Sequence, residues 1–213
     1  ITPFDSGTHA SRQTYAGGIA VKKAATEAKN TLLRFASEHL NIKEERLRIK
    51  DGLIYDVKNP ATNIGVSALL MRLQFEDLSI GKQIIGVATG VAPSSPPIFG
   101  ANFAEVEVDI ETGEVRIVRL VSAFDVGKAI NPTHVEGQIA GGAVMGIGYA
   151  LTEGLIIENG KVLNNNFTDY RIPRACDIPE IDGIIVESNE PTGAFGAKGV
   201  GEATNSATAA AIA

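Results

Sequence analysis

The first third of the chain carries one long helical pattern followed by a hairpin pattern. Between Gly18 and Leu40, apolar residues such as Val21 and Ala25 recur in steps of three and four, which predicts an amphipathic helix over 18–40. Asp51-Gly52 supplies the positive φ angles of a tight turn, so two short strands are expected within 46–57. A second helix is expected over 66–73.

From residue 91 onward the pattern changes to hairpins and glycine-rich segments. The prolines within 91–99 predict an irregular loop, and the strict alternation over 104–110 predicts a strand that turns at Thr112-Gly113 into a second strand over 114–122. The other elements expected there are a buried glycine-rich helix over 137–153, a hairpin over 155–163, a buried strand over 181–188 and a helix over 202–213. Because strands and helices are mixed without a regular strand–helix–strand period, the predicted fold class is α+β.

Composition and charge narrow the class of protein. The chain has 213 residues, of which 44% are apolar and 21% charged, as expected of a folded globular protein. With 25 acidic and 19 basic residues the net charge is −6, so we expect neither a nucleic-acid partner nor an anionic membrane surface as a partner. The longest uncharged stretch, 137–152, is too short to span a bilayer, and we expect a cytoplasmic protein.

Cysteine and histidine usage argues against several metal sites. The single cysteine, Cys176, forms no intrachain disulfide and cannot supply the four thiolates that an iron–sulfur cluster usually requires. The three histidines are scattered, so a zinc or non-haem iron site is not expected. If the protein moves electrons, the relay therefore lies on another chain or segment.

Two segments combine glycine with polar residues near a helix start. In 7–14, small residues and hydroxyls offer free backbone N–H groups to an anion, and Arg12 can make a bidentate contact; the alternative is an ordinary N-cap. In 125–142, Gln138 has both a donor and an acceptor for an oxo group, a phosphate or a pterin edge, while neighbouring glycines admit a ligand. The alternative is a tightly packed helix with a solvated glutamine.

The third such segment, 193–202, is a glycine loop that ends at a helix start. It resembles a phosphate cradle but fits neither the Walker motif nor the dinucleotide-binding fingerprint. Glu202 lies in the first turn, where the helix dipole favours the ionised carboxylate, so Glu202 is a candidate general base. The alternative is a glutamate that only stabilises the helix start.

Together these segments form an ordered set of motifs that spans nearly the whole chain. The set consists of A-S-R at 10–12, A-E-V-E-V-D at 104–109, D-V-G at 125–127, N-P at 131–132, G-Q-x-x-G-G at 137–142, N-F-x-D-Y-x-I-P at 166–173 and G-A-K-G-V-G-E at 196–202. In order and spacing, it resembles the molybdopterin-binding subunit of the xanthine dehydrogenase and aldehyde oxidase family. The resemblance implies a cofactor-binding domain over 1–213 with two sub-lobes near 1–90 and 91–213.

The resemblance also implies a chemistry. In this family molybdenum is held by the dithiolene of molybdopterin, here expected in its cytosine dinucleotide form, and the protein supplies no direct metal ligand. The implied reaction is hydroxylation of an electron-poor carbon of an N-heterocycle or aldehyde, with water as the oxygen source. Hydride passes to the sulfido ligand of molybdenum, and the electrons leave through iron–sulfur clusters.

Site residues follow from the same motifs. Glu202 is similar to the catalytic glutamate of the family, and Gln138 to a glutamine beside the molybdenum oxo ligand. The other residues expected to contact the cofactor are Ala10, Ser11, Arg12, Gly137, Gly141, Gly142, Lys198, Gly199, Val200 and Gly201.

The family's large subunit is several times longer than this chain, and its first cofactor-binding half is absent here. The chain is therefore expected to be the C-terminal part of a molybdenum subunit, as a fragment or as a split subunit of the nicotinate dehydrogenase kind, and to be inactive alone. Expected partners are the N-terminal half of that subunit, an iron–sulfur subunit, an FAD subunit and a small-molecule substrate. A non-catalytic module that binds the cofactor or assembles with partners stays the alternative, with a purely structural α+β domain as the third reading.

Overall fold

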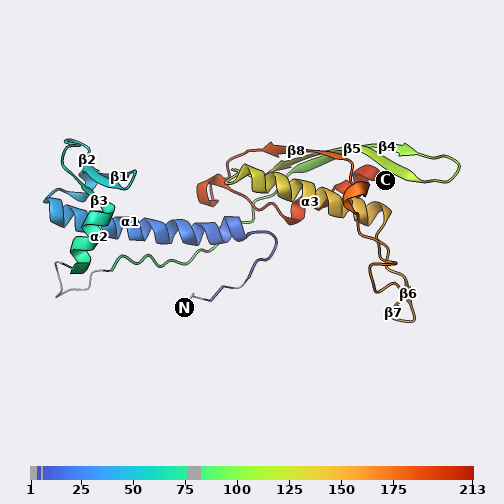
Figure 1. Cartoon of the computed structure of the whole chain (residues 1–213), viewed down its shortest axis with the longest axis horizontal. Helices are drawn as coiled ribbons and strands as arrows, with labels where there is room; N and C mark the ends of the chain where they lie inside the picture. Colours follow the sequence, from blue (N-terminus) through green and yellow to red (C-terminus); the bar gives the residue numbers. More distant parts are fainter. Residues whose placement is uncertain (1–3, 6, 76–82) are drawn as a thin grey trace. The chain divides into compact units, whose positions relative to one another are not determined.

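A computed structural model describes residues 4–5, 7–75 and 83–213, and it divides into two compact units (Figure 1). One unit, called the small unit here, is Ile19–Val91; the other, the large unit, combines the described residues up to Gly18 with Ala92–Ala213. The predicted division near residue 90 coincides with a boundary between the units, but the N-terminal segment belongs with the later part of the chain. None of the helices that the structure describes combines the length and apolar character needed to cross a membrane.

The small unit packs one end of a long helix against a three-stranded sheet. Its elements are α1 (Gly18–Leu40), η2 (Glu44–Arg46), β1 (Leu47–Lys50), β2 (Leu53–Asp56), β3 (Asn63–Gly65) and α2 (Val66–Phe75). The strands form an antiparallel sheet in the order β1-β2-β3, and Leu47, Ile54 and Leu69 are buried against Ala36 of α1. Both predicted helices and the hairpin at Asp51-Gly52 are confirmed, whereas β3 was not predicted.

The predicted apolar face of α1 is only half correct. Leu32, Phe35 and Ala36 pack in the core, but Val21 is 69% exposed and Ala25 is also exposed. The small sheet and α2 lie against the C-terminal half of α1. Towards its N-terminal half, α1 contacts the segment around Gly86 and Val87, which lies against Ala24 and Ala28 and leaves Val21 and Ala25 exposed.

In the large unit, helices cover one face of a three-stranded sheet, visible in Figure 1 beneath β8, β5 and β4. The strands are β4 (Gly100–Val108), β5 (Val115–Asp125) and β8 (Glu180–Val186); β4 pairs antiparallel and β8 parallel with β5. The parallel pairing requires a crossover connection, which contains α3 (Pro132–Leu151). Leu120 and Phe124 of β5 are buried against α3, and α4 (Thr208–Ile212) adds Ile212 to the core.

Smaller elements complete the large unit. They are η1 (Gln13–Gly17), β6 (Ile157–Glu158), β7 (Lys161–Val162), η3 (Ala175–Asp177), η4 (Ala194–Gly196) and η5 (Glu202–Asn205). The predicted loop over 91–99, the long hairpin of β4 and β5 and the short hairpin at Asn159-Gly160 are confirmed. The α+β class is confirmed as well.

Three predicted elements differ in their extent or burial. Helix α3 begins at Pro132 rather than at residue 137, because Asn131 caps it and proline suits the first helical position. Strand β8 is at the edge of the sheet and leaves Ile184 48% exposed, so it is not a buried strand. The single helix expected over 202–213 is broken into η5 and α4, and Ser206 donates its hydroxyl proton to the Ala203 carbonyl at the break.

Candidate functional site

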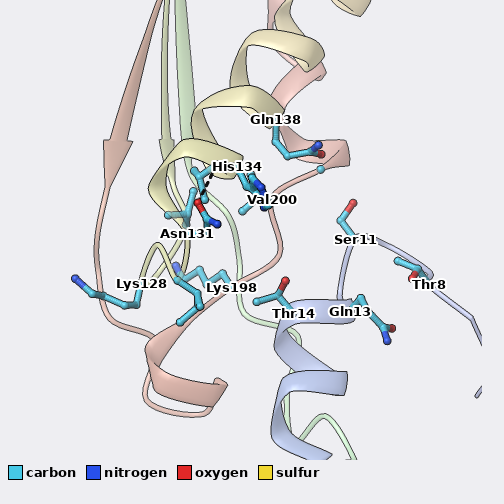
Figure 2. A pocket seen from close by; sticks show the side chains of 14 residues that line it. Thr8, Ser11, Gln13, Thr14, Lys128, Asn131, His134, Gln138, Lys198 and Val200 are labelled. Atoms are coloured by element: carbon cyan, nitrogen blue, oxygen red, sulfur yellow. Dashed lines mark hydrogen bonds between the residues drawn. The ribbon is translucent and has the colours of Figure 1, made fainter. Parts of the chain in front are cut away.

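A pocket of about 420 Å³ lies within the large unit, where three separate segments meet (Figure 2). The segments are the N-terminal stretch before α1, the turn that leads from β5 into α3, and the glycine loop before η5. The residues that line it are Thr8, Ser11, Gln13, Thr14, Val126, Lys128, Ile130, Asn131, His134, Val135, Gln138, Lys198, Val200 and Gly201.

The glycine loop is held against the end of β5 by backbone contacts. The Lys198 N–H donates to the Val126 carbonyl at 2.9 Å. Gly127 has a φ of +70°, and a Cβ at this position would lie 2.3 Å from the Gly196 carbonyl oxygen. Only glycine allows this approach, so the D-V-G motif serves to bring the loop next to the start of α3.

The start of α3 gives one wall of the pocket a positive electrostatic character. Asn131 accepts a hydrogen bond from the His134 N–H at 3.2 Å, and Asn131, His134, Val135 and Gln138 line the pocket from the first turns of this 20-residue helix. Lys128 adds a half-exposed ammonium group that is bonded to Glu187 at 2.7 Å. A helix N-terminus with these amide and ammonium groups suits an anionic ligand such as a phosphate ester.

Ser11 connects the N-terminal segment to the glycine loop. Ala10 and Ser11 both adopt left-handed backbone conformations, with φ values of 51° and 52°. The Ser11 hydroxyl oxygen accepts a hydrogen bond from the Glu202 N–H at 2.8 Å, and a Cβ at Gly199 would lie 2.6 Å from the Ser11 carbonyl oxygen. The hydroxyl of Ser11 therefore fixes the first residue of η5.

Gln138 approaches the same point from α3. A Cβ at Gly201 would lie 3.0 Å from the Ser11 Oγ and 3.2 Å from the Gln138 Oε1, and Figure 2 shows both side chains directed toward this place. Three predicted residues, Ser11, Gln138 and Gly201, thus converge although they are far apart in the sequence.

Glu202 lies at the edge of this convergence. It is the first residue of η5 and is exposed, and it follows Gly201 directly without itself lining the pocket. Its role as a general base stays a prediction, and the structure adds that its backbone is anchored by Ser11.

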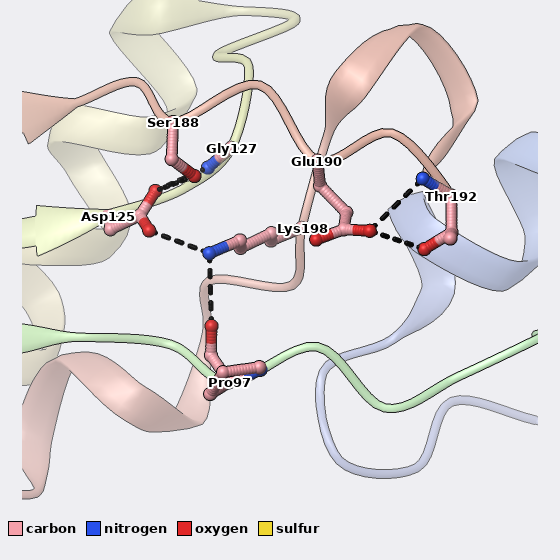
Figure 3. Close-up of polar contacts among 7 residues, drawn as sticks. All are labelled: Pro97, Asp125, Gly127, Ser188, Glu190, Thr192 and Lys198. Atoms are coloured by element: carbon pink, nitrogen blue, oxygen red, sulfur yellow. Dashed lines mark hydrogen bonds and ion pairs between the residues drawn. The ribbon is translucent and has the colours of Figure 1, made fainter.

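Lys198 lines the pocket, but its ammonium group is bonded to the protein (Figure 3). The Nζ lies 2.6 Å from the Asp125 Oδ2 and 3.0 Å from the Pro97 carbonyl oxygen. Burial raises the pKa of Asp125, but the hydrogen bonds that it accepts from Lys198, Gly127 and Ser188 outweigh burial and hold the pKa below its usual value. The Asp125 carboxyl group is therefore ionised at neutral pH.

The glycines of α3 divide between two faces. Gly137 and Gly141 are exposed, and a Cβ at either position would meet nothing within 4 Å. Gly142 lies on the opposite, buried face, where a Cβ would be 2.0 Å from the Thr204 Oγ1. Gly142 was expected to admit a ligand, but the structure gives it a packing role against Thr204.

Of the remaining predicted residues, some line the pocket and others do not. Val200 lines the pocket, whereas Ala10, Arg12 and Gly199 are not among its lining residues. Arg12 is exposed, and Gly199 packs against Ser11.

Sequence reasoning missed part of the lining. The scattered histidines give no reason to expect His134 at the site, and Lys128 lies outside the residues that the motifs indicate. A signal for both was available, since they flank the Asn131-Pro132 helix start that directs them to the same end of α3. Within the described residues, no group of three or more His, Cys, Asp or Glu side chains is placed to hold a metal ion.

Comparison with known proteins identifies the family of the chain. The model of the molybdopterin cofactor-binding domain family matches residues 1–179. The chain belongs to this family. The resemblance that the motifs indicated is thereby confirmed.

Relatives extend the similarity through the glycine loop. The putative xanthine dehydrogenase molybdenum-binding subunit of Escherichia coli K12 is 36% identical over 214 residues, which cover 100% of this chain and 28% of that protein. Among solved structures, quinoline 2-oxidoreductase from Pseudomonas putida 86 is 29% identical with a TM-score of 0.82, covering 97% of this chain and 27% of that one. Reconstituted CO dehydrogenase from Oligotropha carboxidovorans is 26% identical with a TM-score of 0.84, covering 97% and 26%. The chain spans about a quarter of the length of these relatives.

Proposed function

We propose that this chain is the C-terminal part of the cofactor-binding subunit of a molybdenum hydroxylase. The proposed reaction oxidises an electron-poor carbon of an N-heterocycle or aldehyde and takes the new oxygen from water. The observation that carries the proposal is the convergence of Ser11, Gln138 and Gly201 beside Glu202, in a chain of the molybdopterin-binding family. A relative named quinoline 2-oxidoreductase supports an N-heterocycle as the substrate class.

The pocket has the chemistry that a pterin cofactor with phosphate groups requires. The α3 N-terminus, the Ser11, Thr8 and Thr14 hydroxyls and the Lys128 ammonium suit a phosphate, and the Gln138 amide suits a pterin edge or an oxo group. We infer the cytosine dinucleotide form, whose second phosphate would use the same polar wall. When bound, the molybdenum cofactor supplies a site that accepts an electron pair from the substrate, and iron–sulfur and FAD subunits carry the electrons onward.

Glu202 is the proposed base. Its carboxylate accepts the proton that the water-derived oxygen loses as this oxygen bonds to the substrate carbon. The Ser11 hydroxyl holds the Glu202 backbone, and Gln138 and Gly201 define the neighbouring wall. The remaining substrate-orienting residues are expected on the N-terminal part of the subunit.

The test uses the full-length molybdenum subunit, produced together with its iron–sulfur and FAD partners in a host that makes the cofactor. A panel of N-heterocycles and aldehydes is screened in ¹⁸O-labelled water, and the product is analysed by mass spectrometry. Glu202→Gln is expected to lower kcat by about 10²- to 10⁴-fold. Its molybdenum content should equal that of the unmodified protein.

Glu158→Gln, in the hairpin of β6 and β7, is the matched control and is expected to retain full turnover. Retained activity in Glu202→Gln would overturn the assignment of the base. Product without ¹⁸O from water would overturn the hydroxylase proposal itself.

A further inference from the structure

The ammonium group of Lys198 is enclosed by the protein instead of facing the pocket. The side chain is 6% exposed, and its Nζ donates to the Asp125 Oδ2 and to the Pro97 carbonyl. The ring of Phe99 lies on a further side, with its centroid 5.9 Å from the Nζ. A lysine that bound a cofactor phosphate would have to leave these contacts.

Both carboxylate oxygens of Asp125 also have hydrogen-bond partners within the protein. Its Oδ2 accepts from Lys198, while its Oδ1 accepts from the Gly127 N–H at 3.0 Å and from the Ser188 hydroxyl at 2.8 Å (Figure 3). The pair therefore joins the end of β5, the turn before α3, the segment after β8 and the glycine loop at one buried point.

The segment that Lys198 begins leads directly to the proposed base. The Lys198 N–H is bonded to the Val126 carbonyl, Gly199 packs on Ser11, and the Glu202 N–H is bonded to the Ser11 hydroxyl. The chain from 198 to 202 is thus held at both ends, by the ion pair and by Ser11. If one end shifts, the carboxylate of Glu202 shifts with it.

We propose that Asp125 and Lys198 are a positioning pair that fixes the segment 198–202, and that Lys198 does not bind the cofactor. The proposal rests on the proposed function, because it concerns the placement of the base Glu202. A misplaced catalytic group costs turnover even when the binding site is intact. Removing one partner also leaves the other charge buried without compensation, which the fold resists by moving the loop.

The experiment compares Lys198→Met with Asp125→Asn in the full-length subunit assembled with its partners. The readouts are molybdenum content, kcat and KM on the best substrate of the screen described above, and hydrogen–deuterium exchange of 196–202. We expect both variants to keep their molybdenum and to lose about 10- to 100-fold in kcat with little change in KM. Hydrogen–deuterium exchange of 196–202 should be faster in both variants than in the unmodified protein.

Two further variants sharpen the comparison. The double variant should be no worse than the poorer single one, because both changes break the same contact. Lys198→Arg, which keeps a cation opposite Asp125, should have a higher kcat than Lys198→Met. Arg116→Met is the control. Arg116 is on the same strand as Asp125, and its ion pair with Glu107 of β4 is exposed, so this variant should leave every readout unchanged.

The outcomes separate this proposal from the proposed function. Loss of molybdenum in Lys198→Met together with unchanged behaviour of Asp125→Asn would show that Lys198 holds the cofactor, and would overturn the positioning pair. Unchanged kcat and exchange in both single variants would overturn it as well. If neither single variant can be produced as folded protein, the double variant tests the positioning pair by the same readouts, because it leaves no unpaired charge buried. Failure of the proposed function would appear in the unmodified protein, as absence of molybdenum or turnover, while the exchange comparison would still test the pair.

Discussion

The buried carboxylate of Asp125 couples the folding of the large unit to pH. Its pKa is held below the usual value by the hydrogen bonds that it accepts, against the opposing effect of burial. A carboxylate of this kind adds stability above its unfolded pKa of about 3.9 and loses that stability as the pH falls through its lower folded pKa. Asp125 is thus a source of acid sensitivity next to the pocket.

We expect the melting temperature of the subunit to fall as the pH is lowered from about 6 to 3, and to fall less steeply in Asp125→Asn. The reason is that the unfolded carboxylate of Asp125 takes up a proton before the folded one does. Differential scanning fluorimetry across this pH range measures the slope. Asp169→Asn, which removes an exposed carboxylate, is the control and should follow the unmodified protein. Equal slopes of melting temperature against pH for Asp125→Asn and the unmodified protein would contradict the expectation.

At the same scale, the motifs selected residues that lie close together in the structure, but they did not predict the individual contacts of these residues. Ser11, Gln138 and Gly201 were chosen from short motifs, and the structure brings them together. The ion pair of Lys198 could not be predicted from its motif, because its partner, Asp125, lies 73 residues earlier in the chain. A glycine loop with a lysine resembles an anion site until the buried carboxylate is known.

At the scale of elements, α3 presents two kinds of glycine. Gly141 is on the exposed face with open space around it, whereas Gly142 permits the close approach of η5, where Thr204 donates its hydroxyl proton to the Gln138 and Gly201 carbonyls. Because Gly201 lines the pocket, this packing helps determine the position of the glycine loop.

Two neighbouring substitutions test this division. In Gly142→Ala the new methyl group would lie 2.0 Å from the Thr204 Oγ1, so η5 must move away from α3. We expect a loss of about 1–3 kcal/mol in unfolding free energy, whereas Gly141→Ala should be neutral or stabilising by up to about 1 kcal/mol. Chemical denaturation of both variants measures the difference. A loss in Gly141→Ala equal to that in Gly142→Ala would contradict the two-face arrangement.

Elements with a strong local signal were predicted well, and those that depend on distant packing were not. The turn at Asp51-Gly52 and the alternation of β4 specify their hairpins locally. The break between η5 and α4 could not be predicted in the same way, because next to the local hydrogen bond of Ser206 with Ala203 the Thr204 hydroxyl contacts a helix more than sixty residues away. The exposure of β8 likewise depends on its edge position in the sheet.

At the scale of the whole molecule, the chain leaves large apolar side chains in solvent. Among them are Phe103 on β4, Tyr149 on α3 and Phe167 after the short hairpin, each more than two thirds exposed. Large exposed apolar surface is typical of interfaces. Since the chain spans about a quarter of its relatives' length, we expect the rest of the subunit to cover these residues.

The same incompleteness should govern cofactor loading. The pocket is open, and its lining comes from three segments of the large unit, so we expect the N-terminal part of the subunit to complete the proposed cofactor site. We expect the chain produced by itself to contain little molybdenum, and the full subunit produced with its partners to contain about one molybdenum per chain, because half of a binding site binds a large ligand weakly. Elemental mass spectrometry with a pterin assay, on both samples from one cofactor-producing host, measures the molybdenum and pterin content.

Equal loading of the chain alone would mean that its own residues suffice to hold the cofactor. Absence of molybdenum from both samples would reject the cofactor assignment and favour a non-catalytic assembly module, in which Glu202 only begins a helix.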